Sequence, residues 1–174
     1  MFSLNIQNDN LYFRDIKPDH LPLILNWYNK VDNFKYATGI DSPISLGALH
    51  QKYAETAICK DEFFAGIYSL KEEKMIGILK GRLKYKGIDT VWISSIVIDN
   101  IYQQKGYGKS AIFLLLDYLK INNKIGGVYL AVIEENAQGR EFWKKQSFQE
   151  LRKMENYLKL QNRNQNVIIM YKKL

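Results

Sequence analysis

The chain has little cysteine and proline and no long apolar run. Its single cysteine, Cys59, excludes an intrachain disulfide and a cysteine-based metal cluster, and it is typical of a reducing compartment. No apolar stretch approaches the roughly 20 residues that span a bilayer. Residues 1–5 lack the basic and apolar regions of a secretory signal. We therefore expect a cytoplasmic protein with no metal centre and no membrane partner.

Composition predicts one globular domain over residues 1–174. The 174 residues are 47% apolar and 25% charged, which is ordinary for a soluble domain with a sizeable core. The net charge is +7, from 25 basic and 18 acidic residues. The basic residues are dispersed, and the alternation of Lys80, Arg82, Lys84 and Lys86 is typical of the solvent face of a strand. We interpret the charge as solvated surface first, as a field for a polyanionic ligand second, and not as a nucleic-acid interface.

Residues 103–110 form a glycine-containing run, Gln-Gln-Lys-Gly-Tyr-Gly-Lys-Ser. An apolar, β-branched segment at 91–98 precedes the run, and a segment with helical character at 110–121 follows it. The start of a helix has unpaired N–H groups and the positive end of a dipole, and glycine lets the backbone approach an anion. The run therefore predicts a site for a phosphate-bearing ligand.

Other interpretations of this run remain open at this point. A P-loop would need glycine where Gln103 stands. A dinucleotide fingerprint would be incomplete, because Ala111 occupies its last glycine position and no acidic residue follows at about 20 residues. A plain turn from strand to helix would also need only the two glycines.

Two linked motifs resemble the GCN5-related N-acetyltransferase (GNAT) family. The first is Gln103-x-x-Gly106-x-Gly108, which is similar to the family's acyl-CoA pyrophosphate loop, Q/R-x-x-G-x-G/A. The second is Asn136-x-x-Gly139-x-x-Phe142-Trp143-x-x-x-Ser147-Phe148, which is similar to N-x-x-A-x-x-F/Y-Y-x-x-x-G-F. Residues 11–27 also resemble the family's first strand and helix, so the resemblance covers nearly the whole chain.

The order of predicted elements agrees with that family's fold. We expect strands at 12–17, 63–70, 75–85, 90–98, 128–133, 148–153 and 167–172, and helices at 19–29, 42–57, 110–121 and 137–145, with Ser42 as the N-cap of the second. The helix at 110–121 is apolar nearly all round, which predicts burial. The resemblance implies a mixed α/β (α+β) fold: a mostly antiparallel twisted sheet, flanked by helices, with a parallel pair at 90–98 and 128–133 that splays apart.

The resemblance implies an acetyl-CoA-dependent N-acetyltransferase. An acetyl group would pass directly from acetyl-CoA, the co-substrate, to a primary amine in a ternary complex. Backbone groups at 96–98 would pair with the pantetheine arm, and amides at 104–109 would hold the pyrophosphate. The expected acetyl-CoA-binding residues are Ile96, Val97, Ile98, Gln103, Gln104, Lys105, Gly106, Tyr107, Gly108, Lys109, Asn136 and Trp143.

The positions for proton transfer depart from the family pattern. Trp143 stands where many relatives have a tyrosine acid, and an indole N–H donates a hydrogen bond but no proton. Ala131 and the pair Ser94-Ser95 stand where other relatives have a glutamate. The catalytic candidates that remain are Asn136, which is also a predicted helix N-cap, and Ser95, acting through a water chain. An acyl-CoA-binding or sensing module without catalysis is therefore the alternative function.

The remaining chemistry-bearing residues are interpreted as structural. His20, His50 and Cys59 lack the spacing of a nucleophile and its base. The resemblance places acceptor selection in residues 18–60 and 148–172, where no acidic cluster stands out. The partners expected are acetyl-CoA and an amine-bearing acceptor, and a homodimer is left open.

Overall fold

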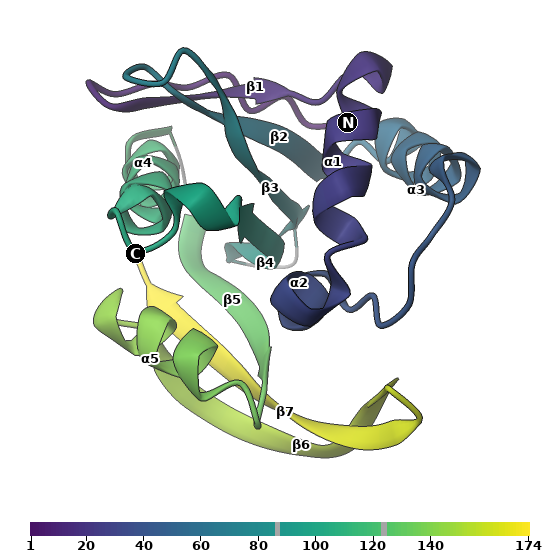
Figure 1. The fold of residues 1–174 in the computed structure, drawn as a ribbon. Coiled ribbons are helices and arrows are strands. Elements are labelled where there is room, and N and C mark those ends of the chain that lie inside the picture. Colours follow the sequence, from purple (N-terminus) through teal and green to yellow (C-terminus); the bar gives the residue numbers. More distant parts are fainter. Residues whose placement is uncertain (86–87, 123–124) are drawn as a thin grey trace.

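A seven-stranded sheet in the order β1-β2-β3-β4-β5-β7-β6 runs through the computed structural model, which describes residues 1–85, 88–122 and 125–174 (Figure 1). The strands are β1 (Leu11–Asp15), β2 (Glu62–Ser69), β3 (Lys74–Lys84), β4 (Asp89–Ile98), β5 (Ile125–Ile133), β6 (Gln149–Leu160) and β7 (Arg163–Lys173). All neighbouring strands are antiparallel except β4 and β5. The fold is therefore the mixed, mostly antiparallel sheet with one parallel pair that the sequence predicts.

Helices cover both faces of the sheet (Figure 1). They are η1 (Pro18–His20), α1 (Leu21–Tyr28), α2 (Val31–Thr38), α3 (Leu46–Ile58), η2 (Asn100–Tyr102), α4 (Tyr107–Asn122) and α5 (Ala137–Lys145). Apolar residues of α1, α2 and α3 pack with Phe64, Ile78 and Val97 on one face. Residues of α4 and Trp143 of α5 pack with Ile93, Leu130 and others on the opposite face. We call the first the α1–α3 face and the second the α4–α5 face.

The parallel strands β4 and β5 separate halfway along their length. Their pairing runs from Asp89 opposite Ile125 to Ile93 opposite Leu130 and stops there. Beyond that point β4 pairs with β3 and β5 pairs with β7. A β-bulge lies at the point of separation, because Ile93 faces Gly81 and Ser95 faces Lys80, which leaves Ser94 as the extra residue of β4. Bulges bend a strand and increase its twist, so the bulge explains why β4 turns away from β5.

The structure corrects several predicted element bounds. Ser45, not Ser42, caps α3, since its side chain accepts a hydrogen bond from Ala48 N at 3.1 Å. Helix α2 was not expected from the sequence; Gly39, at φ 68°, ends it in the left-handed conformation that glycine favours. Helix α4 begins at Tyr107 rather than at 110, so Gly108 belongs to its first turn.

The hairpin β6–β7 is longer than the two strands expected at 148–153 and 167–172. Its two-residue turn, Gln161-Asn162, has φ values of 52° and 58°, as in a type I′ hairpin turn. Turn residues of this type are usually Asn-Gly or Asp-Gly, so Gln161-Asn162 is a weak signal for a hairpin.

Two expectations about exposure are confirmed in part. On α4, Ala111, Ile112 and Leu115 are fully buried, whereas Phe113 is 50% exposed. On β3, Arg82 and Lys84 are exposed as predicted, but Lys80 is only half-exposed. Lys86 and part of the turn expected at 86–89 lie outside the described residues.

Candidate active site

The glycine-containing run forms a tight turn that ends at the start of α4. Gln104 and Gly106 have φ values of 58° and 85°, so the turn depends on left-handed backbone conformations. Ser110 N donates to Gly106 O at 2.9 Å, which closes the first helical turn. The N–H groups of Tyr107, Gly108 and Lys109 lie in that turn and have no acceptor within the helix. They form a row of donors at the positive end of the helix dipole.

The side chain of Gln103 holds this turn against the end of β4. Its Nε2 donates to Ile98 O at 2.9 Å and to Asn100 Oδ1 at 3.1 Å. Asp99 is fixed from the other side, because Trp27 Nε1 donates to its Oδ2 at 2.8 Å. Gln103 therefore positions the loop through its side chain, a role that the sequence motif alone does not show.

Cationic side chains surround the turn. The Lys105 and Lys74 ammonium groups lie 5.6 and 5.5 Å from the centre of the Tyr102 ring, and that of Lys109 lies 5.6 Å from the Phe113 ring. Tyr102 packs edge-on against Tyr107, whose hydroxyl contacts Ser69 and Glu72. Unpaired N–H groups with lysines beside them fit a diphosphate.

The free edge of β4 presents backbone groups to the gap between β4 and β5. Asp99 N donates to Ile76 O on β3 at 2.9 Å. Because hydrogen-bonding direction alternates along an antiparallel strand, Val97 also faces β3, whereas Ile96 and Ile98 face the gap. The Ile98 C=O already accepts a hydrogen bond from the Gln103 side chain. The Ile96 N–H and C=O and the Ile98 N–H are thus left to pair with an amide-bearing chain lying in the gap.

Ser95 carries a buried hydroxyl with no partner. Its Oγ is one of two buried side-chain oxygens without a hydrogen bond among the described residues, the other being Gln146 Oε1. Ser95 lies next to the bulge at Ser94, which is exposed. An unsatisfied buried hydroxyl costs free energy unless a water or ligand pairs with it. The Ser95 hydroxyl at the mouth of the gap therefore needs a water or a polar ligand group as its hydrogen-bond partner.

Asn136 and Trp143 occupy different environments. Asn136 Oδ1 accepts from Gly139 N at 2.9 Å and caps α5, as the sequence predicts, while its Nδ2 donates to no described residue. Trp143 is 7% exposed and packs edge-on against Phe142 and Phe148. Trp143 is therefore largely a core residue, whereas the side-chain amide N–H of Asn136 has no partner among the described residues and is free to reach a ligand.

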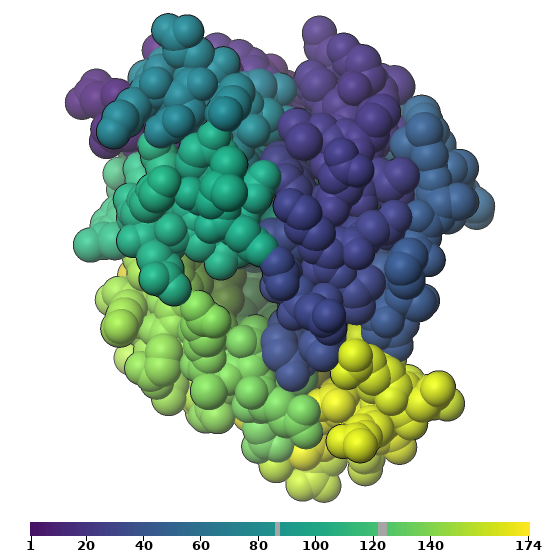
Figure 2. All heavy atoms as spheres, in the orientation of Figure 1, coloured from purple at the N-terminus to yellow at the C-terminus, as the bar shows by residue number. Residues whose placement is uncertain are grey.

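Figure 2 shows where the surface is hollowed near these residues. The hollow lies between the dark-blue region of α1 and α2, the teal region of the β4–α4 loop, and the green region of α5. The hairpin turn, drawn in yellow, lies below α2 in the same view. Its Gln161 N donates to Asp41 Oδ2 at 2.7 Å, and Lys35 Nζ donates to Gln161 Oε1 at 3.1 Å. These contacts join β6–β7 to the segment around α2 across the α1–α3 side of the gap.

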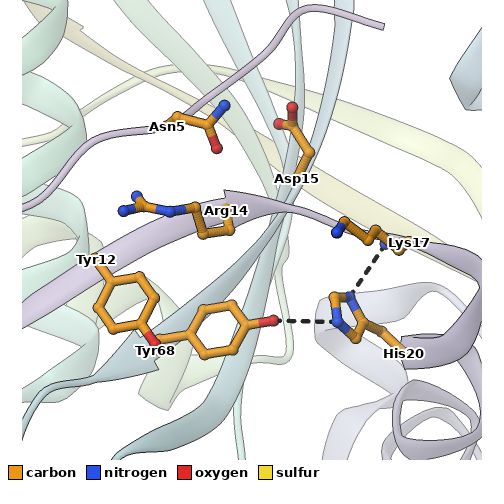
Figure 3. A pocket seen from close by; sticks show the side chains of 7 residues that line it. All are labelled: Asn5, Tyr12, Arg14, Asp15, Lys17, His20 and Tyr68. Carbon is orange, nitrogen blue, oxygen red and sulfur yellow. Dashed lines mark hydrogen bonds between the residues drawn. The ribbon is translucent and has the colours of Figure 1, made fainter.

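A separate pocket lies at the β1 edge of the sheet. Its volume is about 590 Å³, and Tyr12, Arg14, Lys17, His20 and Tyr68 line it with Asn5 and Asp15 (Figure 3). Tyr12 and Tyr68 stack at 4.8 Å, and Lys17 N donates to His20 Nδ1 at 3.1 Å. His20 thus closes the turn at η1, in agreement with its structural interpretation.

No residue of the glycine turn lines this pocket. The carboxylate that lines it, that of Asp15, already accepts hydrogen bonds from within the protein. Asp15 accepts hydrogen bonds from Ser3 Oγ at 2.6 Å and from Leu4 N at 2.9 Å. Among residues 1–85, 88–122 and 125–174, no three histidine, cysteine or carboxylate side chains gather as metal ligands would. The same part of the chain contains no helix both long and apolar enough to cross a membrane.

Comparison with known proteins identifies the fold. A family profile described as an acetyltransferase (GNAT) domain matches residues 14–169. A spermidine N-acetyltransferase from Vibrio cholerae, solved with CoA and spermine, is 22% identical over 95% of this chain and 96% of that chain, with a TM-score of 0.82. No curated protein sequence gives a significant match.

Two further solved structures have the same architecture at lower identity. A probable acetyltransferase from Chromobacterium violaceum is 12% identical over 99% of this chain and 87% of that chain, with a TM-score of 0.85. An acetyltransferase from Salmonella typhimurium, which modifies the N-terminal serine of ribosomal protein L7/L12, is 14% identical over 96% of both chains, with a TM-score of 0.82.

The strand gap, the helix-start turn and the profile match over most of the chain define an acyltransferase of the N-acetyltransferase class. The chain belongs to the GNAT acetyltransferase family, whose members use acetyl-CoA as co-substrate. This agrees with the resemblance found in residues 103–108 and 136–148.

Proposed function

We propose that this chain, acting as one domain over residues 1–174, transfers the acetyl group of acetyl-CoA to a primary amine by direct attack in a ternary complex. The observation that carries the proposal is the gap between β4 and β5, which leads directly to the donor row of Tyr107, Gly108 and Lys109. The structural neighbours that act on spermidine and on a protein N-terminal serine support an amine acceptor. The single cysteine supports a reducing, cytoplasmic setting.

Each part of the site would have one task. The turn at 103–109 would hold the diphosphate, and Ile96 and Ile98 would pair with the pantetheine arm. The neutral amine attacks the thioester carbonyl and forms the C–N bond, the C–S bond breaks, and the proton that the amine loses passes through water to the departing thiolate. The Ile98 N–H would stabilise the negative charge that develops on the carbonyl oxygen, as backbone donors do in acyl transfer.

Ser95, Asn136 and Trp143 would have different roles around the reacting groups. The partnerless Ser95 Oγ would hold a water that accepts the proton of the amine, which supports its candidacy as a catalytic residue. Asn136 would donate through Nδ2 to the acetyl-CoA side of the site while Oδ1 caps α5. Trp143 would act as packing beneath the cofactor rather than as an acid.

The alternative is a module that binds acyl-CoA without transferring the acyl group. The observation that favours it is the absence of an acidic or basic side chain at Ala131, Ser94, Ser95 and Trp143. Both functions share the acetyl-CoA site and differ only in turnover.

Calorimetric titration with acetyl-CoA, with ATP as control, tests the shared site first. We expect 1:1 binding of acetyl-CoA and none of ATP. Mass spectrometry of a panel of amines then tests transfer, and an acetylated amine is the expected product. Binding without any product would favour the acyl-CoA-binding module, whereas no binding would remove both functions.

A further inference from the structure

The row of residues that crosses the mouth of the gap has a positive charge on each side. On the β4 side, Ser95 faces Lys80 of β3. On the β5 side, Ala131 faces Ile169 of β7, which in turn faces Arg152 of β6. Directly opposed residues of antiparallel strands point to the same face, and Ile169 packs with Ile133 and Val167 on the face opposite α4. Lys80 and Arg152 therefore share the α1–α3 face, where the acceptor would approach.

Lys80 lies close to the gap and is partly withdrawn from solvent. Its side chain is 28% exposed, and its ammonium lies 6.0 Å from the centre of the Phe64 ring. Burial lowers the pKa of Lys80, and the nearby carboxylate of Glu62 acts in the opposite direction. Lys80 and Ser95 lie opposite each other on neighbouring strands, so their backbones are about 4.8 Å apart.

Arg152 supplies the second charge and is unengaged. It is exposed, and it has no hydrogen-bond or ion-pair partner among the described residues. Two strand spacings, about 10 Å, separate its backbone from Ala131 at the edge of the gap. The flexible guanidinium side chain is suited to pairing with carboxylate or phosphate.

The carboxylates nearest to Lys80 have partners of different kinds. Glu62 contacts both Lys80, at 3.8 Å, and Arg82, and Asp61 contacts Arg82 at 3.5 Å. Asp41 accepts the hydrogen bond from Gln161 N of the hairpin turn. Glu55 also lies near Lys80, so the charge of Lys80 is largely offset, whereas Arg152 has no carboxylate partner among the described residues. A polycation placed beside Arg152 would be repelled by it, because like charges brought together at an interface disfavour binding.

We propose, on the basis of the transferase function above, that the acceptor is a primary amine carried by a net anionic molecule, with Arg152 and Lys80 as its specificity-determining residues. A carboxylate or phosphate near the amine would pair with Arg152 while the amine points into the gap. The chain would then discriminate against polyamines, the acceptors named for the Vibrio cholerae neighbour.

The test compares kcat/KM for matched acceptors at low ionic strength, with acetyl-CoA as donor. The panel holds a peptide with free N-terminal Ser-Asp-Asp, the same peptide with Ser-Lys-Lys, spermidine, and an amino-sugar phosphate. We expect the anionic acceptors to be favoured by about tenfold or more, and the preference to shrink as salt is added, because exposed charges are screened. The acidic peptide and the sugar phosphate distinguish a polypeptide source from a small-molecule source.

Charge reversal at one position provides the matched control. Arg152→Glu should reverse the preference between the acidic and basic peptides, whereas Lys159→Glu should leave it within about twofold. Lys159 is exposed on the same strand, its pairing with Asn164 beside the pair Leu158–Gln165 directs it to the opposite face, and both substitutions change the net charge equally. Thermal melting verifies that both variants fold.

Each result decides one of the two proposals. A preference of the unaltered protein for spermidine or the basic peptide, or an unchanged ratio in Arg152→Glu, would overturn the anionic-acceptor proposal alone. Acetyl-CoA binding without acetylation of any acceptor would instead overturn the transferase function, and the acceptor proposal with it.

Discussion

At the scale of single residues, the two glycines of the turn have different reasons to be glycine. Gly106 has a φ of 85°, and a Cβ there would meet no atom within 4 Å. Its requirement is therefore conformational. Gly108 has ordinary helical backbone, and its Cβ would lie 3.5 Å from the Phe142 ring and 3.9 Å from Ile98. We therefore propose that glycine is needed at position 108 because acetyl-CoA passes above the first turn of α4.

These reasons predict opposite responses to the same substitution. Gly106→Ala should strain the turn by about 1–2 kcal/mol and weaken acetyl-CoA binding by about tenfold, because alanine resists the left-handed conformation. Gly108→Ala should leave thermal stability nearly unchanged, and Gly108→Val should abolish acetyl-CoA binding through steric conflict. Calorimetric titration of the three folded variants measures this. Equal affinity in Gly108→Val and the unaltered protein would contradict the placement of the ligand.

The roles of Asn136 Oδ1, which caps α5, and Asn136 Nδ2, which would reach acetyl-CoA, can be tested separately. Asn136→Asp keeps the Oδ1 cap but removes the Nδ2 donor, so stability should hold while acetyl-CoA binding weakens. Asn136→Ala should lose both, including about 1 kcal/mol of stability from the missing cap. Urea unfolding and calorimetry on the same samples distinguish the two effects. If Asn136→Asp binds acetyl-CoA normally, the residue is a helix cap only.

At the scale of elements, the structure joins the hairpin β6–β7 to the segment that follows α2. The contact consists of Asp41 with Gln161 N and Lys35 with the Gln161 side chain. Because these contacts are exposed, they fix the position of the hairpin turn more than they stabilise the whole fold.

Removing the Asp41 contact should therefore loosen one element selectively. In Asp41→Ala, the amide hydrogen of Gln161 should exchange faster, while the global free energy of unfolding changes by about 1 kcal/mol or less. Asp32→Ala is the control, because Asp32 is an exposed residue of α2 with the same side chain. Hydrogen exchange with mass spectrometry reports both variants, and equal exchange at the turn in both would refute the role of the contact.

At the scale of the whole molecule, ion pairs join α5 and the end of β5 to β6. The hydrogen bond from Arg140 lowers the pKa of Glu150, and the hydrogen bond from Lys153 lowers the pKa of Glu134. The folded state therefore keeps these carboxylates ionised at pH values where the unfolded chain, with the ordinary value of 4.5, begins to protonate. Their contribution to stability is present above about pH 4.5 and is lost as the pH falls below it.

Acid unfolding should show this dependence. The urea midpoint should fall between pH 5 and pH 3, and Glu150→Gln should reduce the slope of that fall, because the group that gains a proton has been removed. Glu155→Gln, an exposed change in the same strand, should leave the slope unaltered. Identical slopes in all three proteins would show that the Arg140 contact does not form in solution.

Much of this molecule could be predicted from its sequence because its signals are local. Helix α5 begins and ends as expected, and β2, β3 and β4 are placed within a residue or two, since period-two patterns and turn residues mark them. Helix α2 and the length of β6–β7 were not predicted, because α2 has no side-chain cap and β6 is exposed on most of its residues. The order of the strands followed from the family motifs rather than from periodicity.

The candidate site also has parts that the sequence predicts and parts that only the fold reveals. The turn at Gly106 was visible in the sequence, whereas the bulge at Ser94 depends on the register between β3 and β4, which no local pattern encodes. The same is true of the alignment of Lys80 on β3 with Arg152 on β6, across the three strands between them. Pairing of distant strands brings such residues together, so they become candidates only once the fold is known.

The free edge of β4 and the start of α4 have a consequence for how this protein can change over generations. A ligand held mainly by peptide groups places few demands on side-chain identity, so most substitutions along the cradle are neutral to selection while the backbone path is kept. Drift can then proceed far without loss of shape, as the identities of 12–22% between this chain and the solved neighbours illustrate. In such a lineage we expect selection to retain Gly106, Gly108 and the bulge at Ser94, while the residues of the acceptor face are free to change.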